Sequence, residues 1–271
     1  MCGRYASARK RVELLEEFRI ERDRVTEPLD PDYNVAPTKP VYAVLTRAPR
    51  TTAPGAADDE TKADHAAREL RVVRWGLVPS WAKDPSMGGR LINARAETVD
   101  SKPAFRKAFA RRRCLLPADG YYEWQPRKVD GRTVKRPYYI SRADGGPLAM
   151  AGIYELWRDR AVPDDHEHAW LWTAAIITTN APDELGRIHD RMPMIIGADS
   201  WADWLDPASD DPADLRALLA PAMSGGLVWR PVSTEVNSVR HNGAQLIEPI
   251  EPVEPGDVAG PPGAAERADR R

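Results

Sequence analysis

The sequence from Leu148 to Trp157 reads LAMAGIYELW, and a second run, WLWTAAIITT, extends from Trp170 to Thr179. Both runs are dense in apolar, aromatic and β-branched residues, which pack well on a pleated surface. Neither is interrupted by proline. We therefore predict two long, largely buried strands at these positions.

Shorter apolar runs on either side of these two predict further strands, at residues 41–46, 70–75, 114–117, 121–125, 138–141, 194–196 and 229–232. The dipeptide Asp130-Gly131 predicts a tight hairpin turn. Helices are predicted at residues 8–18, 105–113, 200–205 and 212–219. Many short strands with few helices predict an α+β fold, a single domain with a curved, barrel-like, mainly antiparallel sheet flanked by short helices.

Two segments differ in composition from the rest. Residues 47–68 contain Ala, Pro, Thr, Asp and Gly with almost no large apolar side chain, so we predict a flexible insertion at a hairpin tip. Residues 251–271 have a similar character and are predicted to form a disordered tail. The predicted domain therefore covers residues 2–250.

Composition excludes several classes of protein. The 271 residues carry a net charge of −2, so any nucleic-acid binding must come from local patches rather than from global charge. Two cysteines are too few for a disulfide-stapled secreted fold, and no Cys/His spacing resembles a zinc site. Neither a secretory signal nor a 20-residue apolar span is present, which predicts a soluble cytoplasmic protein without a membrane partner.

Cys2 stands next to the initiator Met1. Removal of Met1 would leave an α-amine and a thiol on one residue, with pKa values near ~8 and ~8.5. An aldehyde can condense with this amine, and the thiol can then close a five-membered thiazolidine. Cys2 can equally be an incidental residue, and taken alone it carries little weight.

Three other residues could take part in chemistry. Glu123 lies between aromatic residues on a predicted strand, where desolvation raises the pKa of a carboxyl group; it could instead be a surface carboxylate paired with arginine. His189 lies in a predicted loop and could move protons or be purely structural. Asn93 lies among apolar neighbours and must find partners if buried, either a substrate or a turn.

Residues 102–113 carry six cations and no acid, namely Lys102, Arg106, Lys107, Arg111, Arg112 and Arg113. This run is either a solvated helix face or a phosphate-contacting patch. Trp75 and Trp81 flank a short loop sequence, and exposed Trp side chains can stack on unpaired bases. Core packing is the alternative for Trp75.

Taken together, several blocks of sequence resemble the SRAP family (SOS response-associated peptidase-like proteins). They follow the family order from residue 2 to about residue 250. The blocks are MCGRY (1–5), YNVAP (33–37), RWGLVPSW (74–81), NARAET (93–98), RCLLPADGYYEW (113–124), AGIY (151–154), TTNA (178–181), HDRMP (189–193) and VNSVR (236–240).

The resemblance implies an abasic site processing protein, which binds single-stranded DNA and forms a covalent crosslink to abasic sites during replication. It implies that Cys2 is the nucleophile and that Asn93 positions its amine. It further implies that Glu123 acts as acid and base, and that His189 orients or protonates the sugar oxygen.

The resemblance also implies DNA-binding residues. Arg4, Arg95 and Arg191 correspond to phosphate contacts, and Trp75 to a base-stacking or wedge residue. No metal or cofactor is implied. The implied partners are DNA with abasic sites and the replication machinery, for a monomer associated with the bacterial nucleoid when it acts on DNA.

Two alternatives remain open at this point. The historical name of the family suggests a cysteine peptidase with self-processing activity, in which Cys2, His189 and Glu123 form the reactive set. A non-covalent binding module for modified or single-stranded DNA is the other alternative.

Overall fold

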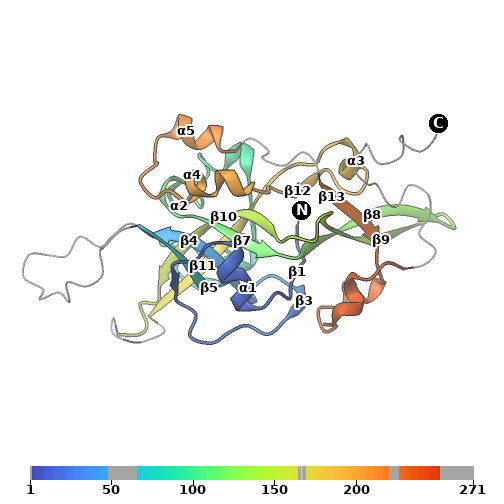
Figure 1. Cartoon of the computed structure of the whole chain (residues 1–271), viewed down its shortest axis with the longest axis horizontal. Helices are drawn as coiled ribbons and strands as arrows, with labels where there is room; N and C mark the ends of the chain where they lie inside the picture. The colour runs from blue at the N-terminus through green and yellow to red at the C-terminus, as the bar shows by residue number, and fades with distance from the viewer. Residues whose placement is uncertain (1, 48–65, 164–165, 167–168, 220–225, 251–271) are drawn as a thin grey trace, which may run out of the picture.

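The computed structural model describes residues 2–47, 66–163, 166, 169–219 and 226–250 (Figure 1). Most of the predicted insertion at residues 47–68 and the whole predicted tail at residues 251–271 lie outside these residues. The ends of that insertion are strand: Arg47 ends β4, and β5 begins at Ala67, three residues before the predicted start.

Five strands form a closed barrel. Along the barrel β11, β10, β7, β4 and β5 are neighbours, and β5 then pairs in parallel with β11 to close the ring. The four other contacts are antiparallel. This confirms the predicted barrel-like fold. The strands are β4 (Pro40–Arg47), β5 (Ala67–Trp75), β7 (Arg113–Ala118), β10 (Leu148–Arg158) and β11 (Trp170–Asn180).

Three short strands extend the barrel sheet. β6 (Asn93–Arg95) pairs in parallel with β11, β12 (Arg191–Pro193) pairs antiparallel with β11, and β2 (Arg22–Asp23) pairs with β5. The predicted strand at 194–196 was therefore wrong in its bounds. Residues 194–196 form isolated backbone hydrogen bonds to β10 and β11 instead of a continuous ladder. Met150 of β10 and Ile195, for example, form an isolated bridge.

A second sheet packs beside the barrel, with the order β13-β9-β8-β1-β3. β8 and β9 form a long hairpin whose two-residue turn has Asp130 and Gly131 both at positive φ. This confirms the turn predicted at this dipeptide. The strands are β1 (Tyr5–Ser7), β3 (Asp32–Val35), β8 (Gly120–Val129), β9 (Arg132–Arg142) and β13 (Leu227–Pro231).

Short helices pack around the barrel and, in the case of α3, beside β12 and the second sheet (Figure 1). They are α1 (Arg11–Glu17), α2 (Arg106–Arg111), α3 (Asp183–Gly186), α4 (Trp201–Leu205) and α5 (Pro212–Ala217). Single 3-10 turns cover Pro85–Arg90, Ala96–Thr98, Ala198–Ser200, Thr234–Asn237 and Ala244–Ile247.

Alternating side chains of the barrel strands divide the core in two. One set, including Leu115 and Ile153, packs against Phe109 of α2 and Trp204 of α4. The other set includes Cys114, Met150 and Ile176, and it also takes in Cys2 and the aromatic residues of β1 and β8. The residue expected to be reactive therefore belongs to a buried cluster shared by the barrel and the second sheet.

Candidate functional site

Cys2 precedes β1 and is completely buried. Its thiol donates a long hydrogen bond to the carbonyl of Arg4, with 3.9 Å between sulfur and oxygen. Burial raises the pKa of this thiol well above its ordinary value, and the nearby carboxylate of Glu123 adds to the rise. Cys2 is therefore a neutral thiol at pH 7 in this conformation.

Asn93 holds the backbone of Cys2. It is the first residue of β6, which lies along β11 with Asn93 opposite Ile176. Its side-chain Nδ2 donates to the carbonyl oxygen of Cys2 at 2.7 Å. Its Oδ1 is buried and has no hydrogen-bond partner among the described residues, so this side chain retains an acceptor beside Cys2.

Glu123 lies on β8 with only 4% of its surface exposed. Burial raises its pKa to about 7, while the positive charge of the chain's amino terminus acts in the opposite direction. A carboxyl group with a pKa near neutrality can both donate and accept a proton at physiological pH.

His189 follows α3 in a turn before β12. Its Nδ1 accepts the backbone N–H of Arg191 at 3.0 Å, and Oδ1 of Asp190 lies 3.0 Å from the same nitrogen. A neutral ring cannot accept from one and donate to the other through a single nitrogen. Burial lowers the pKa of His189, which favours the neutral ring, with Nδ1 as acceptor and the proton on Nε2.

Glu123, His189 and Arg191 line one small pocket, together with Tyr121 and Met192. Two segments far apart in the chain, β8 and the turn that leads into β12, thus bring a carboxyl group, an imidazole and a guanidinium to one place. Cys2 is close enough for the charge of Glu123 to raise its pKa.

Arg191 is more enclosed than a phosphate-binding residue is expected to be. Its guanidinium is bound bidentately by Glu97, at 2.6 and 3.0 Å, and only 11% of its side chain is exposed. Glu97 was not among the residues predicted from sequence, although it stands in the same block as Asn93. An acidic residue four positions after an asparagine does not by itself indicate a functional site.

Arg4 also has internal partners. Its Nη1 donates to Oδ1 of Asn34 at 2.7 Å and to the carbonyl of Val236 at 2.9 Å. Val236 packs with Ala6 in a cluster separate from the one that includes Cys2. Asn34 is fully buried and binds three carbonyls of residues 236–241, so Arg4 belongs to a clamp on the C-terminal segment.

The expected role of Trp75 as a base-stacking residue is not compatible with this structure. Trp75 is completely buried, its indole N–H donates to the carbonyl of Ile92, and its ring packs edge-on against Tyr5 at 5.1 Å. It has no free face for a base. Trp81, in the following loop, is 56% exposed, and Arg95 is exposed on β6 beside Asn93.

The basic run at 102–113 divides by burial. Arg113 is buried and donates to five backbone carbonyls. Arg111 and Arg112 form ion pairs with Asp210 and Glu155. Lys102, Arg106 and Lys107 are exposed. Only Arg113 is fully buried; Arg111 is exposed although it has an ion-pair partner, and the other exposed cations lie before and at the start of α2.

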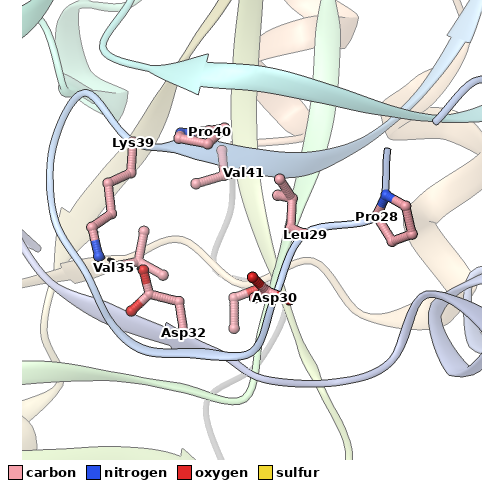
Figure 2. Close-up of a pocket in the computed structure, with 9 residues that line it drawn as sticks. Pro28, Leu29, Asp30, Asp32, Val35, Lys39, Pro40 and Val41 are labelled. Atoms are coloured by element: carbon pink, nitrogen blue, oxygen red, sulfur yellow. Dashed lines mark hydrogen bonds and ion pairs between the residues drawn. The ribbon is translucent and has the colours of Figure 1, made fainter. Parts of the chain in front are cut away.

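A second, larger pocket lies between the loop at residues 28–31 and the start of β4. Figure 2 shows the amine of Lys39 directed at the carboxylate of Asp32, and these two groups lie 2.5 Å apart. None of the candidate catalytic residues lines this pocket. The described residues contain no cluster of three or more His, Cys, Asp or Glu side chains arranged to bind a metal ion.

A comparison with protein families matches residues 1–239 to the family described as SOS response associated peptidase (SRAP). The chain belongs to the SRAP family. Within the described residues, the helices are all too short or too polar to cross a membrane.

Relatives in the SRAP family include the abasic site processing protein YoaM of Bacillus subtilis, which is 35% identical over 92% of this chain and 98% of its own length. The abasic site processing protein YedK of Escherichia coli is 32% identical over 92% of this chain and its whole length. Another relative is the chicken abasic site processing protein HMCES, 32% identical over 93% of this chain and 78% of its own length.

The fold also resembles solved structures. A protein from Bacteroides thetaiotaomicron matches with a TM-score of 0.71 and 25% identity, over 92% of this chain and all of the other. A Bordetella bronchiseptica protein matches with a TM-score of 0.60 and 26% identity, over 86% of this chain and all of the other.

Proposed function

We propose that this protein processes abasic sites in single-stranded DNA by forming a thiazolidine crosslink between Cys2 and the ring-opened sugar. One observation carries the proposal: the backbone of Cys2 is fixed by Asn93 beside a carboxyl group, Glu123, whose pKa is about 7. The family relationship supports it, since relatives with nearly full coverage are named abasic site processing proteins.

The chemistry begins once Met1 is removed. The ring-opened abasic sugar presents an aldehyde at C1′, and the neutral amine of Cys2 attacks it. Loss of one water molecule gives an imine. The thiol then adds across the C=N bond, so that sulfur bonds to carbon and the thiol proton ends on nitrogen. The net reaction joins aldehyde and aminothiol and releases one water.

The proton transfers in these steps need a group that can both accept and donate a proton. Glu123 with a pKa of about 7 fits this requirement, because it can take a proton from the attacking amine or thiol and deliver one to the leaving hydroxyl. His189, neutral and protonated on Nε2, can donate to the sugar oxygen during ring opening.

The resulting ring explains why the DNA strand would survive. An imine at C1′ promotes β-elimination, which breaks the strand, whereas a thiazolidine has no C=N bond to withdraw electrons. Single strands suit this site because their bases are free to stack and their backbone bends easily. Arg95 and Trp81 are the exposed side chains that we propose contact the strand.

The peptidase alternative has less support. A cysteine nucleophile of a peptidase needs a depressed thiol pKa and an imidazole partner. Here burial raises the pKa of Cys2, and its thiol donates to a backbone carbonyl.

A denaturing gel with an oligonucleotide carrying one abasic site tests the proposal. Wild-type protein should give a shifted band, and intact mass spectrometry should show protein plus DNA minus one water. Cys2→Ala should give no stable band, whereas Cys114→Ala, which changes the other buried cysteine, should crosslink normally. A retained tag before Cys2 should abolish the band.

Three results would contradict a crosslink through Cys2. Peptide cleavage without a shifted band would support the peptidase. A complex on a native gel with no covalent band would support a non-covalent binding module. A crosslink that persists in Cys2→Ala would show that another side chain reacts.

A further inference from the structure

The guanidinium of Arg191 reaches across β11 and has acceptors for all four of its terminal N–H groups. Nη1 donates to Oε1 of Glu97 and to Oδ1 of Asn180, both at 2.6 Å. Nη2 donates to Oε2 of Glu97 at 3.0 Å and to the carbonyl of Thr178 at 2.6 Å. No terminal N–H remains for a phosphate.

The fifth donor of Arg191 is different. An arginine carries five N–H groups in a rigid plane, so fixing the two terminal nitrogens also fixes the direction of Nε. Nε is buried and has no hydrogen-bond partner among the described residues. Arg191 lines the pocket that Glu123 and His189 also line, so a residue of the candidate site carries an unpartnered donor.

Glu97 supplies the negative charge that pairs with Arg191 and fixes the orientation of its guanidinium. It is the one acidic partner of Arg191 in the described residues, and it binds both terminal nitrogens. The hydrogen bond from Arg191 lowers the pKa of Glu97, which is therefore ionised at neutral pH. Asn180 and Thr178 contribute neutral acceptors only.

Arg191 is also connected to His189 through its backbone, because its N–H is the donor to Nδ1 of the imidazole. This backbone donor favours the neutral His189 ring with its proton on Nε2, and the same residue carries the guanidinium that Glu97 holds.

We infer that Glu97 is a positioning residue for the crosslinking reaction. It holds Arg191 so that Nε, rather than the terminal nitrogens, is the donor available to the sugar, and so that His189 keeps its proton on Nε2. This inference rests on the proposed function. It assigns to Arg191 a role in sugar recognition in place of the phosphate contact expected from sequence.

The inference makes an uncommon prediction for affinity and rate. Removing the charge of Glu97 frees the terminal nitrogens of Arg191 to contact a DNA phosphate, so binding should stay equal or become tighter. The reaction should nevertheless slow, because Nε and His189 lose their fixed positions. Loss of a residue that only stabilises the fold would not lower the crosslinking rate while leaving DNA affinity equal or higher.

Glu97→Gln and Asp100→Asn form a matched pair for this test. Asp100 lies three residues further along and pairs with the exposed Arg216 of α5 at 2.6 Å, away from the pocket. Single-turnover crosslinking to an abasic oligonucleotide is measured over a range of protein concentrations. This gives the maximal rate and the half-saturating concentration for each variant.

Glu97→Gln should lower the maximal rate about tenfold, the loss expected when a charge-assisted hydrogen bond is removed. Its half-saturating concentration should be unchanged or lower. Asp100→Asn should match wild type in both. A wild-type maximal rate in Glu97→Gln, or a higher half-saturating concentration with no loss of rate, would overturn the inference.

The ring nitrogens of His189 give a readout that needs no DNA. In ¹⁵N-labelled protein, wild type should show a protonated Nε2 and an unprotonated Nδ1 at neutral pH, and Glu97→Gln should lose this preference. Identical ring spectra would count against the inference. If wild type forms no crosslink, the proposed function fails, and this spectrum still tests the positioning.

If Glu97→Gln does not fold, Arg191→Lys takes its place. Lysine keeps the positive charge but cannot present two terminal nitrogens and Nε in one plane. The same loss of maximal rate is expected, and a wild-type rate in this variant would overturn the inference.

Discussion

Nδ2 of Asn93 lies 2.7 Å from the carbonyl oxygen of Cys2, 91 residues away in the chain. This bond ties the segment before β1 to β6, and β6 is in turn fixed along β11. The position of the residue proposed to react is therefore set by the barrel and not only by the adjoining strand.

Asn93→Ala should slow crosslinking about fivefold to tenfold, because a net hydrogen bond of about 1 kcal/mol no longer holds Cys2 in place. Single-turnover rates at saturating abasic oligonucleotide measure this. Asn242→Ala is the control, since it removes a similar amide-to-carbonyl bond, to Pro31, and the acceptor of the Tyr33 N–H, both outside the candidate site. Equal rates in both variants would contradict the role of Asn93.

Glu123 should make stability depend on pH. Its pKa in the folded protein is raised from 4.5 to about 7, so the folded state retains a proton that the unfolded state has lost. Stability is then fully present below pH 4.5 and falls as pH rises through about 7. The full difference corresponds to about 3 kcal/mol.

Denaturant unfolding of wild type and Glu123→Gln between pH 4.5 and pH 8 checks this. Glutamine does not titrate, so the gap between the two proteins should change across this interval in favour of the variant. A constant gap would show that Glu123 has an ordinary pKa. The same variant should slow crosslinking, because glutamine cannot exchange a proton.

Trp75 and Trp81 should behave in opposite ways. Trp75→Ala should cost about 3 to 5 kcal/mol of stability, as expected for a buried aromatic side chain. Trp81→Ala should leave stability within about 0.5 kcal/mol. It should weaken binding to single-stranded DNA by about 1 to 3 kcal/mol if its ring stacks on a base. Thermal unfolding and fluorescence anisotropy with a labelled oligonucleotide separate the two.

Arg113 should contribute to stability and not to DNA binding. Arg113→Met preserves the length of the side chain but leaves several carbonyls without their donor, at a cost of about 3 kcal/mol. Arg106→Met, on the exposed side of α2, should change stability by no more than about 0.5 kcal/mol. Equal unfolding midpoints in the two variants would contradict this assignment.

The long strands could be predicted from sequence because their apolar runs are continuous and their turns are marked, as at Asp130-Gly131. The strands Arg22–Asp23, Asp32–Val35 and Asn93–Arg95 could not. They are short and partly polar, and each is defined by its pairing with a neighbouring strand: β2 with β5, β3 with β1 and β6 with β11. Such pairing depends on tertiary position rather than on local pattern.

The candidate site shows the same division. Residue types and the family resemblance pointed to Cys2, Asn93, Glu123 and His189, and the structure brings them to one region. The surroundings were not predictable. The sequence left Trp75 open between base stacking and core packing, and the structure shows it buried with its indole N–H bound to the carbonyl of Ile92. Nothing in the sequence around Arg191 indicates that its guanidinium forms an ion pair with Glu97.

Complete burial of Cys2 has a consequence for the life of the protein in the cell. Free sugars, reactive carbonyl compounds and oxidants are common small molecules, and an accessible aminothiol would react with them. A protonated sulfur sealed among aromatic rings reacts slowly with such small molecules. Discrimination between abasic DNA and small soluble carbonyl compounds would then depend on which of them can induce the conformational change that exposes the thiol of Cys2.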